Sequence, residues 1–383
     1  MPGAKDKQIP IAAPVIGDGE IKAVREVLES GWLTQGSRVT AFEEKFAEMH
    51  SVKHAVAVTS CTTGLHLALH AMGIAPGDEV IVPAFTWVAT ANVVVHCGAT
   101  PVFVDVERES FNIDPSLIES AVTDRTRAII PVHLFGLCAN MEAIRKAVSS
   151  RVKILEDAAC AVGASHQGTP AGGLGDAAVF SFHPRKTITT GEGGMITTND
   201  GELAGKLGCL RNHGASVSEE MRHRSPKPHE LPDFDDCGFN YRMTDLQGAV
   251  GLVQVNKLEH FVSERAKWAE WYRRELSGLN WLHCPGEPQR GNHGWQAFVT
   301  WVDPDTTPIS RNELMDQLHA QGIATRPGTH AVHELGAYRE HQSNCPVASE
   351  CAAQTMALPL HNKMTADDYE RVVAGLKQVC ASR

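Results

Sequence analysis

Two side chains, Lys186 and Asp157, occupy positions where they could do chemistry together. The apolar segment 177–182 includes Ser181, and Lys186 follows five residues after that serine, in a loop that runs into a cluster of glycines. A lysine at the carboxyl edge of a buried strand can form a Schiff base with an aldehyde cofactor, and the hydroxyl and loop amides beside it suit a phosphate. The strand-like segment 152–156 is followed directly by Asp157, and a carboxylate beside a pyridine nitrogen keeps that ring protonated and electron-withdrawing. The pair therefore predicts a site for pyridoxal 5′-phosphate (PLP), although Asp157 on its own could equally cap the next helix.

The surrounding sequence predicts the elements that would position these residues. Strand-like apolar runs recur at 80–82, 101–104, 128–132, 152–156, 177–182 and 195–198, and amphipathic stretches such as 115–121 and 141–149 lie between them. Apolar strands that alternate with helices are typical of a mostly parallel sheet covered on both faces. Ligands of such sheets gather at the carboxyl ends of the strands, which is where Asp157 and Ser181 fall.

The last third of the chain has a different pattern. Residues 243–276 have a helical period, with one apolar stripe at Leu246, Val250, Val253, Leu258 and Phe261. We interpret this stretch as the bridge to a second domain, in which 296–302 forms a strand and 309–322 a helix that begins at Ser310 and stops at Gly322. The predicted fold class is α/β, with a three-layer α/β/α large domain (1–250) around a mostly parallel sheet and a smaller C-terminal α+β domain (251–383).

Composition excludes several classes of protein. Apolar residues make up 43% of the 383 and charged residues 21%, which is ordinary for a globular protein. No apolar run approaches the roughly 20 residues of a membrane span, and the N-terminus lacks the apolar region of a signal peptide. The ten cysteines include no C-x-x-C pair, and the 19 histidines show no metal-binding spacing such as H-E-x-x-H. We therefore expect a cytoplasmic protein with reduced thiols and no bound metal, and the net charge of −10 argues against nucleic-acid binding.

Several ordered motifs resemble those of the DegT/DnrJ/EryC1/StrS sugar aminotransferases, a PLP-dependent family of fold type I in the aspartate aminotransferase superfamily. The matching segments are 60–69 (SCTTGLHLAL), 83–92 (PAFTWVATAN), 156–159 (EDAA), the lysine segment 179–194, 210–214 (LRNHG) and 238–244 (GFNYRMT). The resemblance runs from about residue 9 to the C-terminus. It implies an enzyme that moves an amino group, usually from glutamate, onto a keto group of a nucleotide-linked sugar.

The resemblance also implies roles for the residues at the predicted site. Lys186 would form the internal aldimine and then move protons as base and acid, and Asp157 would pair with the pyridine nitrogen. A few relatives carry His in place of this lysine and act as sugar dehydratases, so Lys186 favours transamination. Cys160 stands where the family usually has Gln or His beside the ring hydroxyl, and a thiol is a weaker donor than either. Cys61 stands where relatives usually have Gly or Ala.

Further cofactor contacts follow from the same resemblance. Thr62 and Thr63, in the turn after a strand and before a helix, would bind the phosphate together with Ser181, and a plain helix N-cap is compatible with that role. Trp87 would stack on the cofactor ring, although without the resemblance it could equally be a core or interface tryptophan. Asn240, which could otherwise simply belong to a helix N-terminus, would reach the phosphate of a neighbouring subunit, so the resemblance implies a homodimer with two shared active sites.

The residues expected to meet the substrates lie in four segments. Arg211 and His213 are candidates for recognising the amino donor or the sugar, and the two arginines of this set could contact phosphates. The residues around 326–333 resemble the family's C-terminal substrate loop, which could otherwise be a solvated loop. The complete set of expected substrate contacts is Trp32, Arg211, His213, Tyr241, Arg326, His330 and His333.

Alternatives on the same scaffold remain open. The substrate could be a non-nucleotide keto sugar or a cyclitol, because the catalytic residues handle only the cofactor. A PLP-dependent sugar dehydratase and a non-catalytic regulator that keeps the cofactor are further alternatives. A nucleotide-hydrolysing enzyme is excluded, because the segment 201–207 has the wrong spacing for a phosphate loop and lacks the hydroxyl residue after its lysine.

Overall fold

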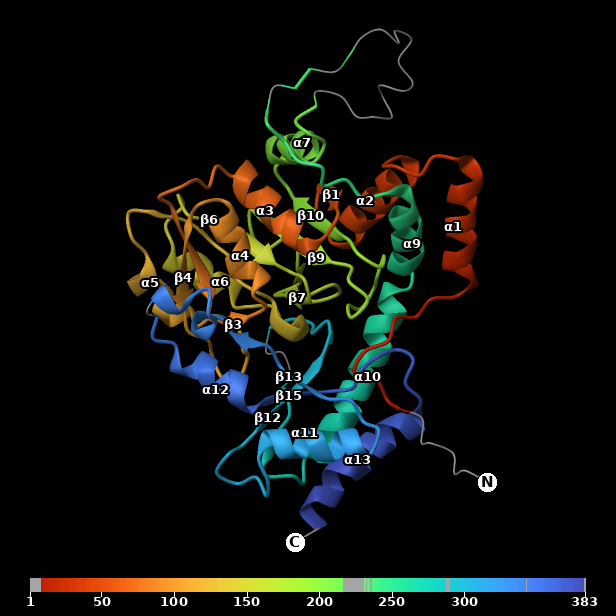
Figure 1. Ribbon diagram of the computed structural model, residues 1–383, viewed down its shortest axis with the longest axis vertical. Coiled ribbons are helices and arrows are strands. Elements are labelled where there is room, and N and C mark those ends of the chain that lie inside the picture. The colour runs from red at the N-terminus through yellow and green to blue at the C-terminus, as the bar shows by residue number, and fades with distance from the viewer. Residues whose placement is uncertain are drawn as a thin grey trace.

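A seven-stranded sheet forms the centre of the larger part of the molecule (Figure 1). The computed structural model describes residues 8–215, 231, 233–234, 236–286, 290–341 and 343–381. The strand order is β1-β10-β9-β6-β5-β2-β4, and β10 alone runs antiparallel to its neighbours. The prediction of a mostly parallel sheet is therefore confirmed. The strands are His54–Val58 (β1), Glu79–Pro83 (β2), Thr100–Val104 (β4), Thr126–Ile129 (β5), Lys153–Asp157 (β6), Ala177–Ser181 (β9) and Gly194–Thr198 (β10).

Successive residues of each strand point to opposite faces of this sheet. In β2, Val80 and Val82 belong to one hydrophobic core, and Ile81 between them belongs to another. The first face is covered by α3 (Cys61–Ala71), α4 (Ala89–His96) and α7 (Gly201–Leu210). The opposite face is covered by α2 (Ser37–Met49), α5 (Ile118–Ala121) and α6 (Met141–Ala147). The strands are apolar throughout because helices cover both faces, which gives the expected three layers.

A smaller antiparallel sheet lies below the large one in Figure 1. Its order is β11-β12-β15-β13, with the strands Leu282–His283 (β11), Phe298–Val302 (β12), Arg326–Pro327 (β13) and Thr355–Leu358 (β15). The helices α10 (Leu258–Leu276), α11 (Arg311–Ala320) and α13 (Ala366–Ala381) share one core with it. Ile9 also lies in this core, and its backbone N–H donates to the Gly322 carbonyl at 2.8 Å. The domain boundary at residue 250 stays a prediction.

Residues 243–276 form two helices, α9 (Asp245–Val255) and α10. The side-chain amide of Asn256 donates to the Leu252 carbonyl at 2.9 Å, where α9 ends. The predicted apolar stripe is wrong for α9, because its members there are only half-buried. The buried face instead carries small residues: a Cβ added to Gly251 would lie 2.5 Å from the Phe42 ring of α2. Helices α2 and α9 therefore pack more closely than a row of large apolar side chains would allow.

The remaining elements are shorter or peripheral. They are α1 (Asp18–Ser30), α12 (Pro346–Gln354), β3 (Phe85–Thr86), β7 (Ser165–His166), β8 (Thr169–Pro170), β14 (His330–Ala331) and the 3₁₀ turns η1 (Pro115–Leu117), η2 (Leu134–Gly136), η3 (Val332–Glu334) and η4 (Arg339–His341). Ser310 caps α11 as predicted, and Gly322 follows the end of that helix with a φ of 76°. Across the described ranges, no helix has the length and apolar character needed to cross a membrane.

Candidate active site

The carboxylate of Asp157 is buried at the carboxyl end of β6. Asp157 is in register with Val179 of the parallel strand β9, two residues before Ser181, so both strand ends meet at one edge of the sheet. Its Oδ2 accepts a hydrogen bond from the Thr90 hydroxyl at 2.8 Å, and its Oδ1 accepts one from the Ala159 amide at 3.2 Å. Burial raises the pKa of Asp157 above its ordinary value, while the Thr90 hydrogen bond opposes that rise. The site therefore holds a desolvated acid, which calls for a positive partner.

The amine of Lys186 reaches the same edge of the sheet. The loop after β9 turns where the Lys186 amide donates to the His183 carbonyl at 2.8 Å. From there, Lys186 Nζ donates to Cys160 Sγ at 3.1 Å. The lysine charge also acts to lower the pKa of Asp157. The structure thus brings Lys186, Asp157 and Cys160 together from two segments of the chain.

Helix α3 presents its N-terminus to this cluster. Ser60 caps the helix by accepting a hydrogen bond from the Thr63 amide at 3.1 Å, and Cys61 Sγ lies 4.0 Å from Asp157 Oδ1. Within the described ranges, the amides of Cys61 and Thr62 donate to no acceptor, and free amides at a helix N-terminus suit an anion. The helix begins at Cys61, so both threonines lie inside its first turn and not, as predicted, in a turn before it. Burial keeps the Cys61 thiol neutral by raising its pKa well above the usual range.

A glycine at the start of β10 allows this helix N-terminus to come close. A Cβ added to Gly194 would lie 2.6 Å from the carbonyl carbon of Ser60. The Ser181 hydroxyl, across from Gly194 in the sheet, accepts a hydrogen bond from the His183 amide at 3.4 Å. One reason for the glycine cluster after the lysine is therefore steric, since a side chain at position 194 would push α3 away from the strand ends.

Trp87 lies at the mouth of the site and is 55% exposed. It follows β3, which pairs with β14 so that Thr86 faces His330. The rings of Trp87 and His330 meet edge to face, with centroids 5.4 Å apart. The Thr86 hydroxyl lies 3.1 Å from that of Thr90, the residue that holds Asp157. The segment around His330 is thus held next to Thr90, the residue that donates a hydrogen bond to Asp157.

Arg185 precedes Lys186 in the chain, and Arg326 is near enough to Arg185 and Cys160 to interact with both electrostatically. Arg326 begins β13, and its Nε is buried and has no hydrogen-bond partner in the part of the chain that the structure describes. Burial lowers the pKa of Arg326, with a further contribution from the charge of Arg185, whereas Cys160 opposes the shift. The Arg185 carbonyl accepts a hydrogen bond from Gln296 Nε2 at 3.0 Å. Sequence reasoning missed Arg185, although its place next to the lysine was a visible signal.

Arg211 is buried at the end of α7, beside the seven-stranded sheet. Its Nη1 donates to the Ala57 carbonyl at 2.7 Å and forms an ion pair with Glu43. The positive charge is therefore already balanced inside the protein. A direct contact between Arg211 and a substrate stays a prediction that this arrangement does not favour.

Three further predicted residues lie on the outer side of α3, next to Phe239. The Tyr241 ring stacks on Phe239, and its hydroxyl lies 3.2 Å from His66 Nδ1. The backbone of His213 donates to the Phe239 carbonyl at 2.8 Å, and both His213 and Asn240 are exposed. The structure of the single chain does not bring these side chains to Lys186, and their roles stay predictions.

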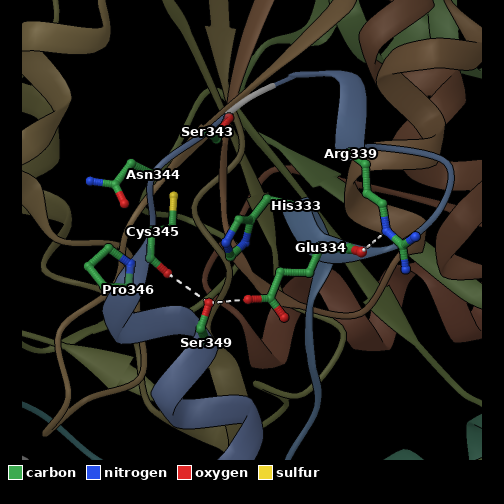
Figure 2. Close-up of a pocket in the computed structure, with 8 residues that line it drawn as sticks. All are labelled: His333, Glu334, Arg339, Ser343, Asn344, Cys345, Pro346 and Ser349. Atoms are coloured by element: carbon green, nitrogen blue, oxygen red, sulfur yellow. Dashed lines mark hydrogen bonds between the residues drawn. The ribbon is translucent and has the colours of Figure 1, made fainter.

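His333 lines a separate cavity of roughly 400 Å³ (Figure 2). The other lining residues are Glu334, Arg339, Ser343, Asn344, Cys345, Pro346 and Ser349. The Ser349 hydroxyl donates to the Glu334 carboxylate across this wall and lies 3.3 Å from the Cys345 carbonyl. Neither Lys186 nor Asp157 lines this cavity, so a substrate contact by His333 stays a prediction.

The loop that carries Trp32 is held by a residue that sequence reasoning missed. The Asp245 carboxylate, at the start of α9, accepts hydrogen bonds from the amides of Gly36 at 2.8 Å and Val39 at 3.0 Å. Trp32 Nε1 donates to the Gln35 carbonyl at 3.2 Å within the same loop. Because more than 200 residues separate Asp245 from its partners, no local pattern could reveal the contact. The predicted substrate contact of Trp32 remains untested.

Comparisons with known proteins agree with this geometry. Residues 14–377 match the model of the DegT/DnrJ/EryC1/StrS aminotransferase family. The chain is 40% identical over 376 residues to the GDP-perosamine synthase of Caulobacter vibrioides, with 97% of this chain and 98% of that protein covered. Its structure is similar to the aminotransferase TlmJ from Streptoalloteichus hindustanus (32% identity, TM-score 0.90, coverage 98% and 99%). It is also similar to the PLP form of the putative sugar aminotransferase Spr1654 from Streptococcus pneumoniae (28% identity, TM-score 0.89, coverage 98% and 99%). That protein has also been solved in a form with pyridoxamine phosphate (PMP).

Proposed function

Because the chain belongs to the DegT/DnrJ/EryC1/StrS aminotransferase family, we propose that it is a PLP-dependent enzyme that transfers an amino group from glutamate to a keto group of a nucleotide-linked sugar. The observation that carries this proposal is the Lys186 amine, which lies 3.1 Å from the Cys160 thiol and beside the buried Asp157 carboxylate. The relative named GDP-perosamine synthase supports a nucleotide-linked substrate. The PLP and PMP forms of the pneumococcal structure support the cofactor.

The donor set of the site fits PLP. Asp157 is a buried carboxylate in need of a positive partner, and a protonated pyridine nitrogen would supply it. The free amides at the start of α3, with the hydroxyls of Thr62 and Ser181, would hold the phosphate. The exposed Trp87 ring would cover a face of the pyridine ring. When bound, PLP would supply an electron sink for the negative charge that develops on the amino-bearing carbon.

Lys186 would act on protons at this carbon. Its Nζ is held by a single hydrogen bond to a thiol, a weak partner that leaves the amine free to turn towards a substrate. As a neutral amine Lys186 would take a proton from the amino-bearing carbon, and as an ammonium it would return the proton to the neighbouring position. Asp157 would keep the ring nitrogen protonated while Lys186 acts.

We further propose that the active form is a homodimer in which Asn240 completes the site of the partner. Asn240 is exposed, and in the described ranges it is paired through a backbone bridge to Asn212, so its side chain is available to a second copy. Mixing a Lys186→Ala protein with an Asn240→Ala protein tests this directly. Hybrid dimers that carry both defects in one site and none in the other should recover activity that neither variant has alone. Failure of every mixture, with exchange of subunits verified by mass, would contradict a shared site.

The first experiment is an absorbance spectrum of the purified protein with PLP, before and after excess glutamate. A visible band that moves to the shorter wavelength of pyridoxamine phosphate would support both cofactor and donor. The Lys186→Ala variant should lose the band and about three orders of magnitude or more in rate. The matched control is Lys146→Ala, an exposed lysine paired with Glu142 on α6.

The sugar is then identified by a panel of acceptors. Turnover with keto sugars that carry a nucleotide, and none with free keto sugars or cyclitols, would support the proposed substrate class. The opposite selectivity would favour the non-nucleotide alternative. Water loss from the sugar without amino transfer would identify a dehydratase, and no turnover with any acceptor would favour a regulator.

A further inference from the structure

The Lys186 amine and the Cys160 thiol are in direct contact. Cys160 lies in the turn after β6 and Lys186 in the loop after β9, and Lys186 Nζ donates to Cys160 Sγ at 3.1 Å. By contrast, Lys206 Nζ donates to the Ala71 carbonyl at 2.9 Å. A thiol is a weaker acceptor than a carbonyl. The contact at the site therefore holds the amine loosely and places a nitrogen nucleophile next to a sulfur that can be oxidised.

The surroundings of Cys160 are those of a reactive thiol. Its side chain is half-buried, so a small oxidant can reach the sulfur. Lys186 contacts that sulfur, and Arg326 interacts with Cys160 electrostatically. Reactive cysteines typically lie at partly exposed positions beside positive groups. Cys160 has both features.

Other cysteines of the chain are protected by burial. Burial raises the pKa of Cys61 well above its ordinary value, and its Sγ lies 3.6 Å from the Val179 carbonyl. Burial likewise raises the pKa of Cys345 and of Cys351 to about 12. These thiols stay neutral at physiological pH, and a neutral thiol is a poor nucleophile. Hydrogen peroxide should therefore oxidise Cys160 before it oxidises these three.

We propose that hydrogen peroxide joins Cys160 to Lys186 through a sulfur–nitrogen bond and so arrests the enzyme reversibly. The peroxide first converts the thiol to a sulfenic acid, passing one oxygen to the sulfur and the other to water. The neutral Lys186 amine then attacks that sulfur. The S–N bond replaces the S–O bond, and the hydroxide leaves as water with the proton that the amine loses. Two molecules of a small thiol reverse the link, restoring the thiol and the amine and leaving as a disulfide.

The consequence for activity rests on the function proposed above. An amine bonded to sulfur can neither bond to PLP nor move a proton, so the linked enzyme would be inactive. In the PLP form the cofactor would occupy the Lys186 amine and prevent the link, whereas in the PMP form the amine would be free. Peroxide would therefore stop the enzyme when the amino donor is plentiful and the sugar acceptor is scarce. The link would also keep Cys160 from the irreversible sulfinic and sulfonic acids.

Mass spectrometry tests the link without turnover. The unmodified protein is loaded with PMP or with PLP, treated with hydrogen peroxide and then digested with trypsin. In the PMP form, cleavage after Lys186 should be lost. One product should contain both residue 160 and residue 186, lighter by two hydrogen atoms than its two separate parts. Dithiothreitol should restore the separate peptides, and the PLP form should give none of the linked product.

Variants identify the two partners of the link. Cys160→Ala and Lys186→Ala should each lose the linked product, and in Lys186→Ala the oxidised sulfur should keep its oxygen. Cys61→Ala should still give the linked product, because the Cys61 thiol takes no part. The matched control is Cys237→Ala, which removes an exposed thiol and should leave the yield unchanged. As a second readout, PLP added to the linked protein should give a visible band only after treatment with dithiothreitol.

The outcomes separate this inference from the proposed function. Oxygen gained at Cys160 in the PMP form, without any linked product, would overturn the link even if every variant failed to fold. A product that disappears in Cys61→Ala would also overturn it and would assign a disulfide, because Cys61 and Cys160 interact electrostatically. Equal yields from the PLP and PMP forms would overturn the dependence on a free amine. A linked product in a protein that never shows a visible band with PLP would support the link and refute the proposed function.

Discussion

The replacement Thr90→Val should raise the pKa of the buried Asp157 carboxyl further above its ordinary value. Thr90 is fully buried, its hydroxyl donates to Asp157 Oδ2 at 2.8 Å, and it lies 3.1 Å from the Thr86 hydroxyl. Valine has nearly the same shape as threonine but no donor. The change therefore removes one hydrogen bond to a buried carboxylate and leaves a second hydroxyl without its partner.

The size of the effect follows from the charge of the acceptor. A hydrogen bond to a charged group contributes about 1.5–3 kcal/mol, so its loss should raise the pKa of Asp157 by about one to two units. Burial already places the folded-state pKa of Asp157 above its unfolded value. In the cofactor-free protein the free energy of unfolding therefore falls as pH rises from the unfolded pKa through the folded one. The substitution widens the pH range between the unfolded and folded pKa values of Asp157. The loss of unfolding free energy caused by Thr90→Val should therefore be about 1.4–2.7 kcal/mol larger above the folded pKa of Asp157 than below about pH 4.

Urea unfolding of the PLP-free protein, followed by circular dichroism across this pH range, measures the difference. Thr90→Ser is the control, because serine keeps the hydroxyl and removes only a methyl group, with a cost of about 0.5–1.5 kcal/mol at every pH. A valine cost that does not change with pH would refute the reasoning. So would a serine variant with the same pH dependence as the valine variant, because the hydroxyl would then not be the cause.

Three further predictions concern groups near the site. Asp157→Asn should keep the absorbance of bound PLP but lower kcat by about 100-fold or more, because the amide cannot hold the ring nitrogen protonated; an unchanged kcat would assign that task to another group. Cys160→Gln should retain PLP, since the hydrogen bond of this thiol in the described residues goes to the Lys186 amine and not to a cofactor-binding backbone group; loss of the cofactor absorbance on gel filtration would mean that the smaller side chain is required. Asp245→Asn should lower the free energy of unfolding by about 1–3 kcal/mol, because a charged acceptor for the Gly36 amide becomes a neutral one; an unchanged urea midpoint would contradict this.

The part of the site that the sequence predicts is the part built from strand ends. Asp157 and Ser181 terminate apolar runs, and parallel strands carry their carboxyl ends to one edge. Lys186 reaches that edge because only a short turn separates it from β9. Parallel pairing of the predicted strands is therefore enough to bring these residues together. No long-range side-chain contact has to be known in advance.

Contacts between distant segments could not be predicted in this way. Arg211 has the residue type of a phosphate ligand, but Glu43, 168 positions away, balances its charge. Thr90 lies in an ordinary run of small and β-branched residues, and its role depends on α4 meeting the end of β6. The glycines of α9 replace the expected apolar stripe because α2 packs against them closely. In each case a partner far along the chain decides what the residue does.

The difference between residues placed by sheet pairing and residues placed by distant partners also explains why the reaction is easier to infer than the substrate. The residues that would hold PLP lie at the edge of the seven-stranded sheet, on helix and strand ends whose positions follow from sheet pairing. The predicted donor and sugar contacts Arg326 and His330 instead lie on short segments that pair with the smaller sheet and with β3. A few changes of side chain or spacing in those segments would alter the shape and charge presented to a substrate while leaving Asp157 and its hydrogen bonds untouched. Substrate preference in this chain should therefore respond to mutations of Arg326 and His330 more than to any change around the cofactor ring.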